Sequence, residues 1–184
     1  MTQPSKMSAL FKLSLKAGVV AAVRVQTKKR QNLDSVDRIV EQWTVEKPEL
    51  ELSAMATIGR LKKCSALVQQ KLDETFSQFS LTSWEFDVLA TLQRSGAPYS
   101  LAPTTLFSSL MITSGTMTHR MNRLESRSLV QRVSNPVDAR SKLLQLTASG
   151  LDLINRAVEA HVENEEHILS TLADSDLASL ELAL

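Results

Sequence analysis

The sequence contains little of several things that define other classes of protein. Its 184 residues include one cysteine and five glycines, and aromatic residues make up 4%. A single cysteine excludes an intramolecular disulfide and any zinc site built from several cysteines. Five glycines are well below the usual share of about 7%, which argues against a turn-rich all-β fold. Runs of about 18 apolar residues, the length needed to span a bilayer, do not occur, so we expect no membrane helix.

Net charge is also low, because 21 basic residues nearly balance 20 acidic ones. The total therefore gives no general reason to expect a nucleic-acid partner. Hydrophobic residues make up 43% and charged residues 22%, which are ordinary globular values and exclude disorder of the whole chain. The charges are unevenly distributed, however. Residues 113–147 contain six basic and two acidic side chains, whereas residues 148–184 contain one basic and eight acidic.

Residues 1–33 contain seven basic side chains and no acidic one. Lys12 and Lys16 interrupt any apolar core of a signal peptide, and only two of the seven are arginines, which disfavours a transit peptide. We interpret this segment as a basic extension outside the fold, disordered or not native. A sharper hypothesis is that translation begins near Leu33 or Val36, where the composition changes. At the other end, the sequence stops at Leu184 within a helical pattern of leucines, and we interpret it as a fragment of a longer chain.

Apolar residues spaced by three and four predict a long helix over residues 53–79, with Ser53 as N-cap. Thr82 followed by Glu85 is typical of a capping box and predicts the start of a second helix, which ends before Gly96. Residues 97–100 read as a loop. Pro103 then suits the first position of a short helix that ends at about residue 110.

A tight turn at residues 111–113 precedes a helix predicted over 114–127. Two short β-type runs follow, at 129–133 and 142–146, on either side of a polar loop, and Thr147 caps a last long helix. This order predicts a mainly α fold with a small two-stranded β wing. It is a winged helix-turn-helix flanked by long helices.

The helix over 114–127 is apolar on one stripe only, through Met117, Met121 and Leu124. Its other faces carry small and hydrogen-bonding side chains, which suit the base edges of a major groove, although any surface helix has a polar face. In the hairpin loop, Asp138 can orient Arg140, and an arginine held on a wing tip suits a minor groove. The predicted DNA-binding residues are Ser114, Thr116, Thr118, His119, Asn122, Arg123, Asp138 and Arg140.

From about Asp34 to Leu184 the chain resembles a MarR-type transcriptional regulator. Residues 138–150 carry the most specific motif, D-x-R followed by L-T-x-x-G at the start of a helix. Residues 86–92 and 114–125 are similar to the second and recognition helices of that family. The sequence departs from the family at Ser128, where a glycine usually follows the recognition helix, at a cost of about 1–2 kcal/mol if the left-handed backbone is kept.

The resemblance implies a homodimeric repressor that binds a pseudo-palindromic operator in duplex DNA. Its winged helix-turn-helix would occupy about residues 81–147, with dimerisation helices at about 36–79 and 148–184. The resemblance also implies a small organic effector that releases the DNA, and a cytoplasmic protein without a cofactor. An activator, or an interaction module that keeps the fold without binding DNA, are the alternatives.

Other candidate sites are weaker. Cys64, beside the basic Lys62 and Lys63, is a candidate redox sensor, but a lone helical cysteine is more often an inert filler. His161 and His167 are six residues apart and therefore lie on different faces of a helix, so we expect no metal site. The sequence contains no nucleophile elbow, phosphate loop or paired catalytic carboxylates, and we therefore expect no enzyme.

Overall fold

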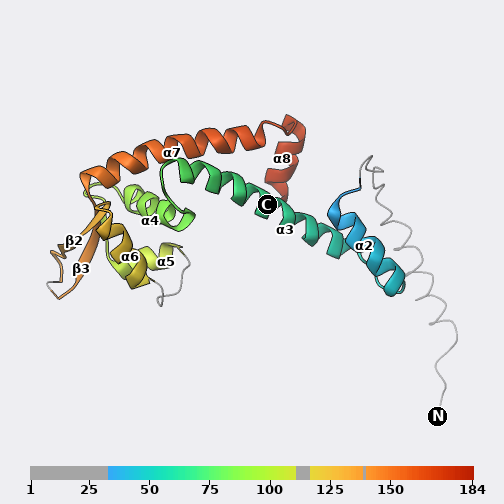
Figure 1. Ribbon diagram of the computed structural model, residues 1–184, viewed down its shortest axis with the longest axis horizontal. Coiled ribbons are helices and arrows are strands. Elements are labelled where there is room, and N and C mark those ends of the chain that lie inside the picture. Colours follow the sequence, from blue (N-terminus) through green and yellow to red (C-terminus); the bar gives the residue numbers. More distant parts are fainter. Residues whose placement is uncertain (1–32, 111–116, 139) are drawn as a thin grey trace, which may run out of the picture. The chain divides into compact units, whose positions relative to one another are not determined.

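The computed structural model describes residues 33–110, 117–138 and 140–184 (Figure 1). The chain divides into two compact units, residues 1–61 and 62–184, and each is described by itself. The elements follow the order α2 (Ser35–Glu46), α3 (Ser53–Gln78), α4 (Ser83–Arg94), β1 (Ser100–Leu101), α5 (Pro103–Leu110), α6 (Met117–Ser126), β2 (Val130–Ser134), β3 (Lys142–Leu146), α7 (Ala148–Leu169) and α8 (Asp174–Ala183).

The described part of the first unit contains α2 and the first turns of α3. Asp34 caps α2, because its Oδ1 accepts hydrogen bonds from the backbone N–H groups of Val36 and Asp37, and the Asp37 carboxylate accepts one from the Asp34 N–H. Gly59 allows the two helices to approach, since a Cβ there would lie 3.0 Å from Cγ1 of Val36. Arg60 forms ion pairs with both aspartates.

The long helix predicted over residues 53–79 is confirmed as α3, but its predicted N-cap is wrong by one position. Ser53 is the first residue of the helix itself. Leu52, which lies before it, already accepts the first helical hydrogen bond from the Ala56 N–H at 3.0 Å. The reason is that helix spacing locates an end only to within a residue or two.

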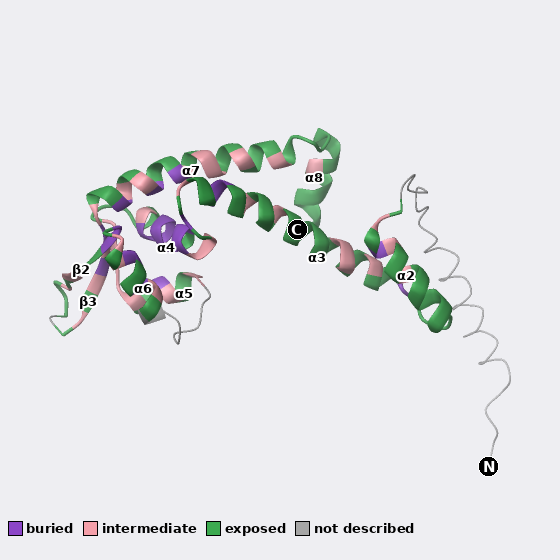
Figure 2. Cartoon of the chain, in the orientation of Figure 1, coloured by how far each residue is buried: buried purple, intermediate pink, exposed green. Residues whose placement is uncertain are grey.

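In the second unit, α4 is the central helix and packs against α5, α7 and β3. Figure 2 shows it as the most deeply buried helix of the fold. The predicted capping box of Thr82 and Glu85 is confirmed at its start. Each fully buried leucine or isoleucine adds about 1.5–3 kcal/mol to stability through its burial. Those of this core are Leu89, Leu92, Leu106, Leu124, Leu144 and Ile154.

The sheet has three antiparallel strands in the order β1-β3-β2, not the two that the sequence predicts. The β2–β3 hairpin pairs Val130 with Leu146 and Ser134 with Lys142. The third strand, β1, comes from the segment expected to be a loop, and its Ser100 pairs with Gln145. A strand of two residues is too short to show an alternating pattern in the sequence. It is recognised only in the structure, where it pairs with the edge of β3.

The hairpin is attached to α7 through a compact junction. Thr147 caps α7 as predicted, with its Oγ1 accepting from the Gly150 N–H at 3.0 Å and donating to the carbonyl of Ser128 at 2.6 Å. Ser128 has φ 56°, the left-handed conformation that its place after the recognition helix requires. At Gly150 a Cβ would lie 1.9 Å from the carbonyl oxygen of Leu129. The backbone contact therefore explains the glycine of the L-T-x-x-G motif.

Candidate nucleic-acid interface

The recognition helix α6 buries one stripe and exposes the rest. Met121 and Leu124 face the core, with 8% and 0% of their surface exposed, as predicted. His119, Asn122 and Arg123 are exposed. The helix is described from Met117, three residues later than the predicted start. The predicted Ser114 and Thr116 lie outside the described residues, and Thr118 lies within the first turn of α6.

A buried carboxylate connects the start of α4 to α6. Glu85 is fully buried, and its Oε1 lies 2.8 Å from Nη1 of Arg127 and 3.2 Å from Nε of Arg123. Its Oε2 accepts from the backbone N–H and the hydroxyl of Thr82, each at 2.9 Å. Burial alone raises the pKa of this carboxyl, but the bonds from Thr82 and Arg127 outweigh burial and hold the pKa below its ordinary value. Glu85 is therefore ionised at neutral pH.

The neighbouring Trp84 adds an aromatic contact on the same side of α6. The guanidinium carbon of Arg120 lies 5.3 Å from its ring centroid, and that of Arg123 lies 5.9 Å away. These distances are within the range of cation–π attraction, which is worth about 0.5–1 kcal/mol at exposed sites. The start of α4 thus contacts α6 through both a carboxylate and an aromatic ring.

On its other side, α6 contacts the wing. Arg132 on β2 donates from Nη2 to the Oδ1 of Asn122 at 2.6 Å, and its Nε lies 3.1 Å from the Glu125 carboxylate. The side chains of Arg132 and Glu125 are 41% and 33% exposed, so solvent reaches this ion pair. Asn122, which the sequence assigns to DNA reading, is therefore also a link between helix and wing.

At the tip of the wing, Asp138 shapes the loop that carries Arg140. The Oδ1 of Asp138 accepts a hydrogen bond from the backbone N–H of Arg140 at 3.0 Å, and its carbonyl accepts from the Ser141 N–H at 3.0 Å. We expected the carboxylate to orient the guanidinium. In the described loop it instead holds the backbone, because an aspartate two residues before an N–H forms this turn readily. Arg140 is exposed.

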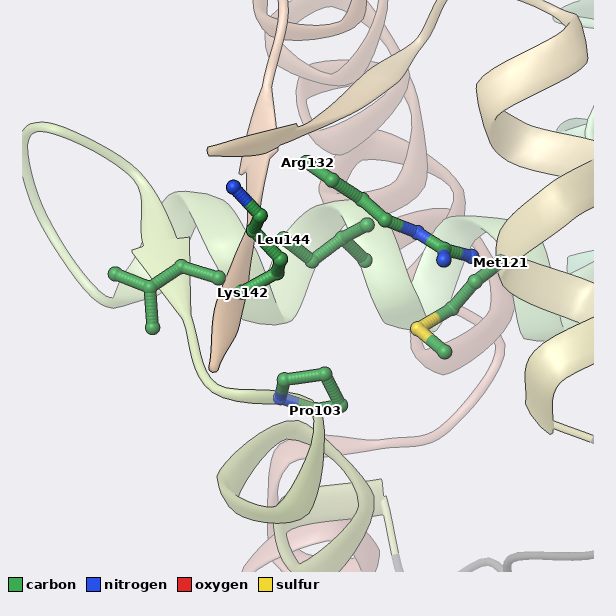
Figure 3. A pocket seen from close by; sticks show the side chains of 6 residues that line it. Pro103, Met121, Arg132, Lys142 and Leu144 are labelled. Carbon is green, nitrogen blue, oxygen red and sulfur yellow. The ribbon is translucent and has the colours of Figure 1, made fainter. Parts of the chain in front are cut away.

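A small cavity of about 170 Å³ lies between α5, α6 and the wing (Figure 3). In Figure 3 the Arg132 side chain extends from its strand toward Met121 of α6, and Pro103 lies at the start of α5. The cavity is lined by Pro103, Met121, Arg132, Lys142, Leu143 and Leu144. It thus combines apolar walls with two cationic side chains.

The described residues offer little for other chemistry. They contain no group of three or more histidine, cysteine or acidic side chains placed to hold a metal ion. Within the same ranges, no helix combines the length and apolar character needed to cross a membrane. Cys64 is exposed as a free thiol. His161 contacts the rings of Phe76 and Phe86, and its Nε2 lies 3.2 Å from the Glu165 carboxylate.

Sequence reasoning missed the residues that hold α6 in place. It assigned Glu85 to the cap of α4 alone and counted Arg127 and Arg132 only as positive charge. Glu85 and Arg127 are separated by 42 residues, so no local spacing signals their contact. The available hint is that Arg120, Arg123 and Arg127 recur at intervals of three and four, which places them on one stripe of a helix.

Comparison with known proteins agrees with this architecture. The model of the MarR family matches residues 81–142. The chain is 44% identical over 149 residues to the HTH-type transcriptional regulator PecS of Dickeya dadantii, an alignment that covers 81% of this chain and 90% of PecS. It is 26% identical over 123 residues to the multiple antibiotic resistance protein MarR of Escherichia coli, covering 64% of this chain and 83% of that protein.

Solved structures show the same fold. AbsC, a MarR family transcriptional regulator from Streptomyces coelicolor, superposes with a TM-score of 0.59 at 21% identity, covering 84% of this chain and 93% of AbsC. The C80S mutant of MarR from Escherichia coli, solved with operator DNA, superposes with a TM-score of 0.57 at 23% identity, covering 77% of this chain and 94% of that chain. With its winged helix-turn-helix and its similarity to PecS, the chain belongs to the MarR family and is a DNA-binding transcriptional regulator.

Proposed function

We propose that this protein binds a pseudo-palindromic DNA site as a homodimer and represses transcription in the cytoplasm, with α6 in the major groove and the wing tip at the adjacent minor groove. The observation that carries this proposal is the placement of two sets of exposed polar side chains in one compact unit. His119 and Arg123 lie on α6, and Arg140 lies on the wing loop. The MarR mutant solved with operator DNA shares this fold.

We assign different tasks to the predicted DNA-binding residues. On α6, His119 is suited to base edges, while Asn122 and Arg123 combine exposure with contacts to the wing and to α4. Asp138 acts through the backbone of the loop, and Arg140 is suited to the narrow, electronegative minor groove. Thr118 lies in the first turn of α6, where helix N-termini approach bases and phosphates, and Ser114 and Thr116, which lie outside the described residues, stay predicted DNA contacts.

Exposed apolar side chains support the proposal of a homodimer. Those in the first unit lie on α2, on the segment after it and on the first turns of α3: Ile39, Trp43, Val45, Leu50, Met55, Ile58 and Leu61. Others lie on α7, on the segment after it, on α8 and at the last residue: Val162, Leu169, Leu172, Leu180, Leu182 and Leu184. Large exposed apolar side chains favour an interface, and a second copy of the chain is the partner that fits the pseudo-palindromic site proposed above. Two-fold symmetry then sets the half-sites about one helical turn apart.

The cavity between α6 and the wing supports the proposal of a small effector. Its volume of about 170 Å³ is close to that of an apolar cavity that holds one benzene molecule, roughly 150 Å³. Arg132 and Lys142 in its lining favour an acidic or phenolic group on the ligand. A ligand there would contact both α6 and β3, so its binding energy could change the position of one relative to the other.

The experiment that tests this function is selection of a binding site from random duplexes, with and without small phenols. We expect a pseudo-palindromic consensus, affinity that falls steeply with salt, and weaker binding when a phenol occupies the cavity. Arg140→Ala should lower operator affinity at fixed salt about ten-fold or more, because it removes a minor-groove contact. Arg156→Ala, which removes an exposed arginine on α7, is the matched control and should change affinity less than two-fold.

Unchanged affinity of Arg140→Ala would contradict the proposed place of the wing. Affinity that is independent of salt would contradict DNA reading altogether and favour an interaction module. A reporter gene placed behind the selected site distinguishes repression from activation, since deletion of the regulator raises expression in the first case and lowers it in the second.

A further inference from the structure

The fully buried carboxylate of Glu85 is the only link described here that joins the cap of one helix to the recognition helix through a single side chain. One oxygen, Oε2, closes the capping box with Thr82. The other, Oε1, faces Nη1 of Arg127 at 2.8 Å and Nε of Arg123 at 3.2 Å. Arg127 is further held by the carbonyl of Ser80, which its Nη2 approaches to 2.9 Å. The start of α4 is therefore attached to the C-terminal end of α6 and to the residue directly after it.

Two neighbours of α6 restrict the Arg123 side chain. Its Nε lies 3.2 Å from Oε1 of Glu85 as an ion pair, and its guanidinium carbon lies 5.9 Å from the ring centroid of Trp84. The side chain is nevertheless 53% exposed. Because a guanidinium is planar and carries four of its five N–H donors on the two Nη atoms, an ion pair on the Nε side leaves most donors available. Glu85 and Trp84 thus restrict the side chain without using the edge that recognises guanine or phosphate.

We propose that Glu85 is a positioning residue for sequence reading, which fixes α6 against α4 through Arg127 and orients the guanidinium of Arg123 toward DNA. This inference rests on the proposed function. Glu85 itself is fully buried and does not contact DNA, so its effect on recognition is transmitted through the two arginines.

The loss of this carboxylate should affect specific and non-specific binding differently. Base contacts depend on the placement of donors within a fraction of an ångström, whereas phosphate contacts tolerate displacement. When Glu85 loses its charge, Arg123 keeps its own charge and gains freedom to bind any phosphate. Specific affinity should therefore fall while non-specific affinity is maintained or rises. A loss of folding would instead reduce both.

The test uses Glu85→Gln in the full chain, because glutamine also serves at this position of a capping box and only the charge is removed. Affinity is measured for the duplex selected with the wild type and for a scrambled duplex of equal length. We expect the ratio of the two affinities to fall about ten-fold or more, with non-specific affinity at least equal to that of the wild type. Circular dichroism at the assay temperature verifies that the variant is folded.

The matched control is Glu74→Gln, which removes the charge of an exposed glutamate paired with Lys71 on α3. It should change the ratio less than two-fold. Arg123→Lys provides a second approach that keeps the charge on α6 and removes the planar fork, and it should reproduce the loss of selectivity. In the Arg123→Lys background, Glu85→Gln should cause a smaller further loss than in the wild type, because only its contact with Arg127 is then left to lose.

A ratio for folded Glu85→Gln within two-fold of the wild type would overturn the inference, as would a parallel fall of both affinities. If Glu85→Gln does not fold, retained selectivity in Arg123→Lys overturns it. These outcomes differ from failure of the proposed function, in which the wild type itself would select no duplex.

Discussion

The two sides of the recognition helix are held by similar residues in different surroundings. On the α4 side, Arg123 of α6 and Arg127, the residue directly after this helix, meet a carboxylate that is fully buried. On the wing side, Arg132 meets the carboxylate of Glu125 with both side chains partly exposed. Breaking a buried pair typically costs about 3–5 kcal/mol, whereas exposed pairs contribute about 0–1 kcal/mol. The two sides differ in the burial of the carboxylate and not in the type of residue, since Arg123 is 53% exposed and Arg132 is 41% exposed. We therefore expect the attachment on the α4 side to be the stronger one.

The strongest test of this difference compares removal of each partner. We expect Glu85→Ala to lower the free energy of unfolding by about 2–4 kcal/mol, because it removes a cap and leaves two arginines without their carboxylate. Arg132→Ala should lower it by less than about 1 kcal/mol. Urea denaturation at one fixed protein concentration measures both, since the stability of a dimer depends on concentration. Equal losses would show that burial does not distinguish the two sides.

A smaller effect is expected where α6 leads into the wing. Ser128 adopts φ 56°, a conformation that costs a residue with a Cβ about 1–2 kcal/mol and costs glycine little. Ser128→Gly should therefore raise the free energy of unfolding, by about 1 kcal/mol. Ser126→Gly, at the last residue of α6, is the control and should lower it, because glycine is unfavourable in a helix. A destabilised Ser128→Gly variant would contradict the strain at this position.

The smallest expected effect is a dependence of stability on pH that comes from Glu85, on the α4 side of the recognition helix. The pKa of Glu85 is lower in the folded protein than its ordinary value of 4.5, so the folded state favours the ionised form. Its contribution is fully present above pH 4.5 and is lost as the pH falls through the folded pKa. The difference in stability between wild type and Glu85→Gln should stay constant from pH 7 to about 5 and shrink below that range. Thermal unfolding of both proteins from pH 7 to below pH 5 measures this difference in stability. A difference that grows in acid would contradict a lowered pKa for Glu85.

Much of the fold follows from local patterns. The capping box at Thr82, the start of α5 at Pro103 and the N-cap at Thr147 were all predicted, because each depends on one residue or on residues three positions apart. The strand at 142–146 was also predicted without error. The short strand β1 was not, since it exists only because β3 offers it an edge.

The candidate site likewise has some features that local sequence patterns predict and others that depend on packing. The amino-acid sequence by itself determined which side chains α6 exposes and which it buries, because the period of a helix fixes its faces. The left-handed backbone at Ser128 was expected only from the resemblance to the family, and the turn that Asp138 forms with the backbone of Arg140 was not expected. Only the tertiary structure decided that Glu85 meets Arg127 across 42 positions and that Arg132 meets Asn122. Such contacts depend on how helices and strands pack, and no pattern of neighbouring residues encodes the distance between two elements that fold against each other.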